Sequence, residues 1–290
     1  MMMRDPSAIA ATDAINVLSA LLEARTGQVI ASNRQWRIET ALKPLTRARG
    51  HATLEELVSE LHDDQTDMVA AMIVDALLNQ ESSFFRDPAT IDLVVKAAEL
   101  MHGNAPGQQL RIWSAGCSTG QEPLSLAMCF AEKSEFWQKN TPEIVATDVS
   151  GIVIAKARAG RFSQFEIQRG LPIRRMIHWF AADGSDWVAS QELLNSILFR
   201  KHNLVGDPAP AGKFDIILCR NVLFYLPPAL RNYVFEKLAA AIRPGGLLVL
   251  GAGETVIGQT EAFAPSQNFR GAYQLTAAAS APSMIGASAS

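Results

Sequence analysis

The chain has 290 residues, of which 48% are hydrophobic and 19% are charged. This composition is typical of a folded globular protein with one large or two modest domains, and it excludes a disordered chain. The formal net charge of −3 argues against a nucleic-acid-binding protein, because such proteins carry a broad basic surface. No signal peptide and no uncharged apolar run of bilayer length is evident, so we expect a cytoplasmic protein without membrane insertion.

Cysteine and histidine spacing gives no sign of a metal centre. Cys117, Cys129 and Cys219 show no CxxC spacing, and we predict that they are buried reduced thiols. The five histidines also lack the spacing of metal ligands, so no metal is expected.

Residues 12–84 are expected to form a small all-α domain, because no convincing strand run occurs in the segment 12–81. Apolar periodicity predicts amphipathic helices over 14–24, 33–45, 53–61 and 67–78. Thr53 followed by Glu56 resembles a capping box at the start of the third helix.

Residues 85–276 are expected to form an α/β domain, because helix and strand patterns alternate after Asp87. The expected later strands are 143–147, 197–202, 214–219 and 247–251, with helices over 89–102, 121–131 and 228–242, and a closing antiparallel hairpin near 262–263 and 272–275. Residues 160–196 do not fit the alternation and are predicted to be an inserted subdomain. The Ala/Ser-rich residues 277–290 are predicted to be a flexible tail. Phe84 and Phe85 are expected to pack in the core between the two domains.

The stretch RIWSAGCSTGQEP, residues 111–123, predicts a buried strand, a tight glycine loop and a helix. Glycine lets the backbone approach a nucleotide-type ligand closely. Gly116 and Gly120 are four positions apart and lack the third glycine of the dinucleotide fingerprint. Glu122, at the helix start, would repel a pyrophosphate but could accept hydrogen bonds from a cationic amino group or from ribose hydroxyls. The ligand is therefore expected to be S-adenosylmethionine rather than a dinucleotide.

Polar residues follow each expected strand at the edge where an open parallel sheet binds its ligand. Asp148 closes the second strand, where an acid can hold the ribose hydroxyls, and Asn203 closes the third, where an amide can read the adenine edge. Arg220, Asn221 and Tyr225 follow the fourth.

Each of these residues also has an ordinary structural explanation, at roughly even odds. Asp148 could cap the next helix, Asn203 could be a turn residue, and Tyr225 could belong to the core. Arg86, in the segment QESSFFRD before the first strand, could be a surface arginine paired with Asp87, at roughly one chance in three. Their joint occurrence at successive strand ends favours a binding site.

Read together, the segments QESSFFRD, IWSAGCSTGQEPLSLAM, ATDVS, HNL, CRNVLFYLP and RPGGLLVLG resemble the CheR family, the chemotaxis-receptor glutamate methyltransferases. STGQEP and CRNVLFYL are the most specific of them, and the resemblance extends to about residue 276. It implies a Rossmann-like S-adenosylmethionine-dependent methyltransferase domain with an inserted small subdomain, preceded by a small all-α domain. Such an enzyme methylates glutamate side chains on the cytoplasmic helices of a chemoreceptor and leaves S-adenosylhomocysteine.

The resemblance also implies residue roles. Tyr225 would lie close to the transferred methyl group. From its residue type, Arg86 could contact the methionine carboxylate of the cofactor or orient the acceptor carboxylate. Cofactor contacts would fall on Gln80, Ser82, Arg86, Glu122, Asp148, Asn203, Leu204, Arg220 and Asn221, beside Gly116 of the glycine loop.

Several positions depart from the family pattern. Gln80 and Ser82 stand where asparagine and threonine are usual, and Gln121 stands in place of the first of two glutamates, which makes Glu122 the better candidate for the functional carboxylate. The insertion has a short final hairpin and no evident glycine-rich loop. In the family that loop grips a peptide at the receptor's carboxyl end, so we expect this protein to use no such tether.

A basic stretch within residues 34–49 is the candidate receptor-docking surface. This stretch contains one acidic residue, Glu39, and five basic residues: Arg34, Arg37, Lys43, Arg47 and Arg49. A solvated helix face is the ordinary explanation. Docking of an acidic receptor helix, with salt-dependent association, is the functional one.

Two other functions remain open at this point. The chain could be a methyltransferase of the same fold acting on a small molecule or RNA, or a regulatory protein that binds the cofactor without catalysis. The helical domain and QESSFFRD favour the receptor methyltransferase, and the absence of a wide basic surface disfavours RNA. A monomer is the default expectation.

Overall fold

The computed structural model describes residues 6–105 and 107–280, which divide into two compact units. The smaller unit contains the chain up to Asn79 together with Tyr225–Leu230, and the larger unit contains Gln80–Phe224 and the chain from Arg231 onward. The short segment 225–230 therefore belongs with the helical unit, although it follows a strand of the larger unit in sequence.

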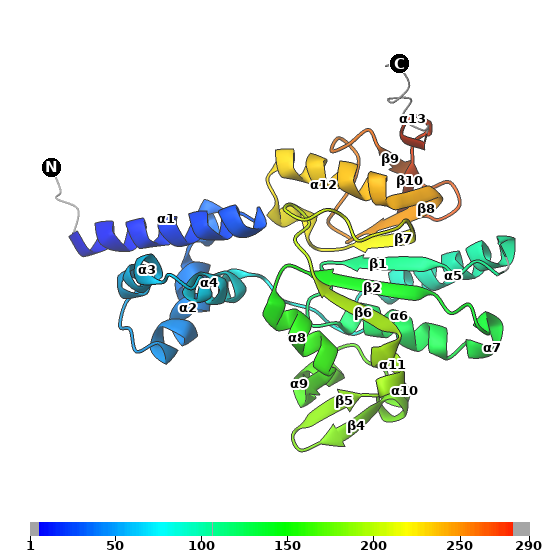
Figure 1. Cartoon of the computed structure of the whole chain (residues 1–290), viewed down its shortest axis with the longest axis horizontal. Helices are drawn as coiled ribbons and strands as arrows, with labels where there is room; N and C mark the ends of the chain where they lie inside the picture. The colour runs from blue at the N-terminus through cyan, green and yellow to red at the C-terminus, as the bar shows by residue number, and fades with distance from the viewer. Residues whose placement is uncertain (1–5, 106, 281–290) are drawn as a thin grey trace, which may run out of the picture. The chain divides into compact units, whose positions relative to one another are not determined.

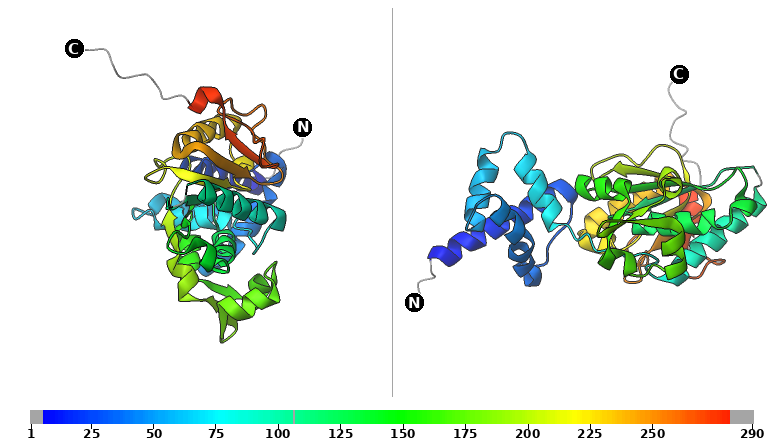
Figure 2. Two further views of the ribbon diagram at one scale, coloured as in Figure 1. Left: turned by 90° about the vertical axis from the view of Figure 1, so that its right-hand side faces the viewer. Right: turned by 90° about the horizontal axis from the view of Figure 1, so that it is seen from below.

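The smaller unit is all helical, as its apolar periodicity predicted. Its elements are α1 (Pro6–Thr26), η1 (Ser32–Arg34), α2 (Trp36–Ala48), α3 (Leu54–Asp63) and α4 (Met68–Leu77), and Figure 2 shows them in blue to cyan. Fully buried side chains recur one helical turn apart, at Leu18 and Leu22 in α1 and at Ile38 and Leu42 in α2. This spacing places each pair on the helix face that packs on the common core.

The predicted capping box at the start of α3 is only half present. Thr53 is the N-cap, and its Oγ1 accepts a hydrogen bond from the Glu56 N–H at 3.4 Å. The Glu56 carboxylate accepts from the N–H of Ala52 at 2.7 Å, one residue before the cap. The start of the helix agrees with the prediction. The hydrogen bond to the Glu56 side chain comes from the backbone of Ala52 and not from that of the N-cap Thr53.

A seven-stranded sheet is the centre of the larger unit, and Figure 1 shows its strands side by side. The order is β6-β2-β1-β7-β8-β10-β9. The strands are β1 (Arg111–Ala115), β2 (Glu143–Asp148), β6 (Ile197–Lys201), β7 (Phe214–Cys219), β8 (Ile242–Leu250), β9 (Phe263–Pro265) and β10 (Ala272–Leu275). The first five run parallel, and β10 and β9 close the sheet antiparallel, which confirms the predicted fold and hairpin.

Helices precede or connect most of the parallel strands. The helix α5 (Pro88–Asn104) precedes β1, while α6 (Gln121–Ala131) and α7 (Ser134–Trp137) join β1 to β2. The helix α8 (Gly151–Ala159) follows β2, and a short η2 (Leu223–Tyr225) and α12 (Pro228–Ala241) join β7 to β8. The strand β8 begins at Ile242 and not at the predicted residue 247, because the RPGG segment continues the strand beside a register shift in β7. Residues Ala277–Ser280 of the predicted flexible tail form the short helix α13, and 281–290 lie outside the described residues.

A second sheet of three antiparallel strands, in the order β3-β5-β4, is built from the segment that did not fit the alternation. Its elements are β3 (Arg161–Ser163), α9 (Gln164–Gln168), α10 (Ile173–Trp179), β4 (Phe180–Asp183), β5 (Asp186–Ala189) and α11 (Gln191–Asn195). Phe84 packs edge-on against Phe162 and Phe180, with ring centroids 5.0 and 5.5 Å apart. Phe84 and Phe85 thus belong to the core of the larger unit, which corrects the expectation of a core between domains.

The three cysteines lie in the interior of the larger unit. Cys117, Cys129 and Cys219 are free and buried, as predicted, and burial raises the pKa of all three thiols. Within the part of the chain that the structure describes, no helix is both long and apolar enough to cross a bilayer.

Candidate active site

The parallel sheet changes winding direction between β1 and β7. The chain proceeds from β1 outward to β2 and β6, and then returns to the other side of β1 to form β7 and β8. Loops at such a switch point separate and leave room for a ligand at the carboxyl ends of the strands. The predicted polar residues follow these strand ends.

Glycine at the end of β1 is required by the close approach of two loops. Gly116 has φ +83°, and a Cβ there would lie 2.3 Å from Cγ2 of Val222, which follows β7. Gly120, at the start of α6, has φ +93°, and a Cβ would lie 3.0 Å from the Cβ of Ala157. Side chains are excluded at both positions, so the backbone lines this part of the edge.

Asp148 holds Ser118 of the glycine loop, and Ser118 in turn binds the segment before α5. Its Oδ2 accepts from the Ser118 N–H at 2.9 Å, and its Oδ1 accepts from the Ser150 N–H at 3.0 Å. The Ser118 hydroxyl donates to the carbonyl of Gln80 at 2.8 Å. Ser150, and not Asp148, caps α8 by accepting from the Val153 N–H. The capping explanation for Asp148 is therefore wrong, and its carboxylate is directed into the loop network.

Glu122 and Arg220 form the most buried ion pair of the edge. Arg220 Nη1 donates to Glu122 Oε2 at 2.9 Å, and Glu122 Oε1 accepts from the Ser114 hydroxyl at 2.7 Å. Arg220 Nη2 donates to the carboxylate of Asp87 at 2.5 Å and to the carbonyl of Arg86 at 3.1 Å. The Arg220 guanidinium thus fixes both the start of α6 and the turn that carries Arg86.

The turn before α5 has an uncommon backbone. Phe85 and Asp87 both adopt left-handed conformations, with φ of 48° and 55°. The Phe85 N–H is held by the hydroxyl of Ser125 at 2.9 Å, while Arg220 holds the residues on the other side. Non-glycine residues in this region cost energy and persist where surrounding contacts over-determine them, commonly at functional sites. Asp87 pairs with Arg220 rather than with Arg86, which removes the ordinary explanation offered for Arg86.

Asn203 forms the turn that its residue type allows. Its Oδ1 accepts from the Val205 N–H at 2.9 Å, and its own N–H donates to the Asp207 carboxylate at 2.8 Å. Lys237 of α12 closes the loop from the other side, because its ammonium donates to the carbonyls of Leu204 and Asp207 at 2.7 and 2.6 Å. The loop after β6 is therefore fixed at both ends.

Asn221 follows β7 with φ 59°, and a carboxylate after β8 holds its backbone. Its N–H donates to Glu254 Oε2 at 2.7 Å. Tyr225, four residues later, belongs to the helical unit: its hydroxyl is hydrogen-bonded by the Asn79 amide, and its carbonyl accepts from the Val29 N–H at 2.9 Å.

Sequence reasoning missed three polar residues that hold this edge. Glu254 could have been found, because it is an acidic residue just after the fifth expected strand. Asp87 was treated only as a possible partner of Arg86. Lys237 gives no signal, because a lysine in the middle of a helix is ordinary.

The donor and acceptor set fits S-adenosylmethionine. Two carboxylates, Glu122 in the first turn of α6 and Asp148 at the end of β2, and two loop amides, Asn203 and Asn221, are held in place by the contacts above. Carboxylates suit an amino group and ribose hydroxyls and disfavour a pyrophosphate.

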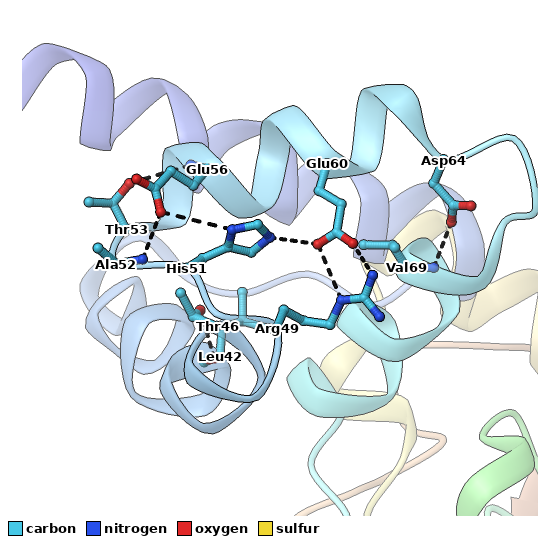
Figure 3. A network of polar contacts seen from close by, with 10 residues as sticks. All are labelled: Leu42, Thr46, Arg49, His51, Ala52, Thr53, Glu56, Glu60, Asp64 and Val69. Atoms are coloured by element: carbon cyan, nitrogen blue, oxygen red, sulfur yellow. Dashed lines mark hydrogen bonds and ion pairs between the residues drawn. The ribbon is translucent and has the colours of Figure 1, made fainter.

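The basic residues of the smaller unit fall into two groups. Arg49 is half-buried and forms an ion pair with Glu60, whose carboxylate is also 2.6 Å from Nε2 of His51, as Figure 3 shows. Arg34, Lys43 and Arg47 are exposed, and Arg37 is partly buried. Trp36, the first residue of α2, is also exposed and keeps 64% of its surface accessible.

Comparison with known proteins gives concordant matches. The family description "CheR methyltransferase, SAM binding domain" matches residues 80–271. Chemotaxis protein methyltransferase 1 of Pseudomonas aeruginosa is 36% identical over 253 residues, which cover 85% of this chain and 92% of that protein. Chemotaxis protein methyltransferase Cher2 of Pseudomonas putida is 34% identical, with 82% of this chain and 88% of the relative covered. A chemotaxis protein methyltransferase of Vibrio parahaemolyticus is 34% identical over 84% of this chain and 90% of its own length.

Proposed function

Because the chain belongs to the CheR methyltransferase family, we propose that it transfers methyl groups from S-adenosylmethionine to glutamate side chains of chemoreceptors, giving glutamate methyl esters in chemotaxis adaptation. The observation that carries this proposal is the pair of carboxylates, Glu122 at the start of α6 and Asp148 at the end of β2, fixed by hydrogen bonds at the carboxyl edge of the parallel sheet.

The proposed cofactor contacts follow the strand ends. Asp148 binds the ribose hydroxyls, Glu122 accepts from the cofactor's amino group, and the Asn203 loop holds the adenine. Gly116 lets the loop after β1 pass close to Val222 and present its backbone to the cofactor, and Arg220 acts by orienting Glu122. The full proposed set is Gln80, Ser82, Arg86, Gly116, Glu122, Asp148, Asn203, Leu204, Arg220 and Asn221.

S-adenosylmethionine supplies a methyl group made electrophilic by its sulfonium. A glutamate side chain is ionised at neutral pH, so this chain needs no general base. The task of its residues is to align the acceptor and to exclude water from it, and alignment alone removes roughly 7–11 kcal/mol from such a barrier. The charges of donor and acceptor both vanish during transfer, so a strongly charged pocket would stabilise reactants more than the transition state. Arg86 and Tyr225 are the proposed catalytic residues: Arg86 orients the acceptor carboxylate and Tyr225 helps to place the methyl group.

The helical unit is the proposed receptor-docking element. Arg34, Arg37, Lys43, Arg47 and Arg49 give it a local charge excess, and receptor signalling helices that carry acidic methylation sites are complementary to it. In this proposal Arg49 acts mainly by holding α2 to α3 through Glu60, while the exposed cations meet the partner.

The remaining partner proposals follow the family departures. The protein acts in the cytoplasm as a monomer. It binds no receptor-tail peptide, because the hairpin formed by β4 and β5 is short. Isothermal calorimetry with a receptor tail peptide tests the last statement, and micromolar binding would contradict it.

Transfer of tritium tests the function as a whole. The purified chain is incubated with methyl-tritiated S-adenosylmethionine and a receptor cytoplasmic fragment, and base treatment follows. We expect volatile tritiated methanol, because base hydrolyses a glutamate methyl ester. Label that is stable to base would indicate another acceptor, and no label despite cofactor binding would indicate a regulatory protein.

A further inference from the structure

The Glu254 carboxylate gathers backbone N–H groups from two loops that follow neighbouring strands. Its Oε1 accepts from Val222 and Leu223, at 2.9 and 2.7 Å. Its Oε2 accepts from Asn221 and Gly251, at 2.7 and 2.9 Å. Hydrogen bonds to an ionised acceptor are about twice as strong as those between neutral groups. One side chain therefore fixes the start of the β7 loop to the end of β8.

The backbone of this loop needs such support. Asn221 is left-handed, with φ 59°, a conformation that asparagine tolerates better than most non-glycine residues but that still disfavours a residue with a Cβ. The two loops also approach closely, since a Cβ on Gly251 would lie 2.9 Å from the Asn221 backbone nitrogen and 2.9 Å from Glu254 Oε2. The conformation of Asn221 thus depends on both the carboxylate and the absence of a side chain at position 251.

We propose that Glu254 is a positioning residue for S-adenosylmethionine, acting through the loop that presents Asn221. The inference rests on the proposed function, in which Asn221 contacts the cofactor. Glu254 itself touches backbone N–H groups of the protein, so its effect is on cofactor affinity and not on the chemical step.

Glu254→Gln tests whether the hydrogen bonds of the carboxylate, and not the size of the side chain, fix the loop. The substitution keeps the size of the side chain but replaces one oxygen by an NH2 group, which can only donate. Each carboxylate oxygen now accepts from two N–H groups, so the amide nitrogen would face two donors. Gly251→Ala tests the same loop independently, because it keeps the carboxylate and separates the two strand ends.

Asp215→Asn is the matched control. Asp215 is a buried carboxylate near the amino end of the same strand β7, where it accepts from the Arg111 N–H at 2.8 Å and pairs with Arg243 at 2.7 Å. Its loss removes comparable interactions at the opposite edge of the sheet. A purely structural role of Glu254 predicts that both variants behave alike.

The experiment is calorimetric titration of the full chain with S-adenosylhomocysteine, together with initial methylation rates and melting temperatures. We expect Glu254→Gln and Gly251→Ala each to raise Kd about tenfold and to leave kcat at saturating cofactor within about threefold. We expect Asp215→Asn to lower the melting temperature while its Kd stays within about twofold.

The inference is overturned if a folded Glu254→Gln variant binds as wild type does, or if Asp215→Asn weakens binding equally. Should Glu254→Gln not fold, the comparison of Gly251→Ala with Asp215→Asn decides. Wild-type protein that does not bind S-adenosylhomocysteine overturns the proposed function as well, whereas binding by wild type and all variants alike overturns only the role of Glu254.

Discussion

Arg220 and Glu122 form an ion pair 2.9 Å long in which the two side chains are only 2% and 14% exposed. Removing one partner of a buried pair leaves an uncompensated charge and costs about 3–5 kcal/mol. We therefore expect Arg220→Met to lower the free energy of unfolding by about 3 kcal/mol and to weaken S-adenosylhomocysteine binding, as measured by urea denaturation and calorimetry.

Two comparison variants make this prediction specific. Arg161→Met removes the ion pairs of Arg161 with Asp183 and Asp186. The side chains of Arg161 and Asp183 are 45% and 62% exposed, so this variant should lower the free energy of unfolding far less than Arg220→Met does. The double variant Arg220→Met with Glu122→Gln should recover part of the stability but not the binding. Equal destabilisation by Arg220→Met and Arg161→Met would contradict the account.

Lys237 should control the loop after β6. Its ammonium donates to three carbonyls, of Leu204, Val205 and Asp207. Lys237→Met keeps the length of the stem and leaves these carbonyls without their donor, so we expect a Kd for S-adenosylhomocysteine raised about fivefold to tenfold. Lys213→Met, which removes a hydrogen bond to the Ala240 carbonyl near the end of α12, is the control and should leave Kd unchanged.

The strand ends could be predicted because the hydrophobic periodicity of each segment and the order of segments along the chain are both read directly from the sequence. Alternation of strands and helices indicated the parallel sheet, and the carboxyl ends of such strands lie at one edge, so Glu122, Asp148 and Asn221 could be named without coordinates. Identification of the cofactor depended partly on the family resemblance.

Other features depend on contacts that a linear pattern does not contain. The Asp87–Arg220 pair joins residues 133 positions apart, and nothing in the spacing distinguishes it from a pair between Arg86 and Asp87. The RPGG segment separates the expected helix 228–242 from the expected strand 247–251, yet Ile242 already pairs with Phe214 of β7, so β8 begins before this segment. Tyr225 reads as a strand-end residue, whereas its contacts with Val29 and Asn79 group it with the helical unit.

Glu60 should make the helical unit sensitive to acid. Hydrogen bonds from Arg49, and then from His51, lower the pKa of the Glu60 carboxyl from 4.5 to about 2. A pKa lowered in the folded state means that the folded state binds fewer protons, so the stabilisation is complete above the unfolded pKa and is lost as pH falls toward 2. We expect Glu60→Gln to reduce hydrogen-exchange protection of α3 strongly at neutral pH and much less at about pH 3. Glu55→Gln, in the same helix, is the control; a pH-independent difference would contradict the prediction.

Arg86→Ala and Tyr225→Phe should each reduce turnover by about tenfold or more, which corresponds to about 1.4 kcal/mol of transition-state stabilisation. Arg86 extends from a turn whose carbonyl and neighbouring carboxylate are held by Arg220, so the alanine variant should keep the turn. Tyr225→Phe removes only the hydroxyl that the Asn79 amide contacts. Single-turnover rates at saturating cofactor measure the effect, and near-wild-type rates in both variants would remove the catalytic assignment.

The exposed cations of α2 should determine receptor affinity without affecting the cofactor. Lys43 and Arg47 lie four positions apart and are both exposed, so they share one face of the helix. Reversing both charges, with Lys43→Glu and Arg47→Glu, should lower kcat/KM for a receptor fragment about tenfold at low ionic strength.

The dependence on salt concentration tests whether the α2 cations act through charge. Exposed charges are screened within about 10 Å at 0.1 M salt, so the difference between variant and wild type should shrink as salt is added. The Kd for S-adenosylhomocysteine should not change. Reversing two exposed cations of the larger unit, Lys139 and Arg174, is the control for net charge. Equal losses in both double variants, or a loss in the α2 variant that salt does not diminish, would exclude α2 as the docking surface, because a contact between opposite charges must respond to ionic strength.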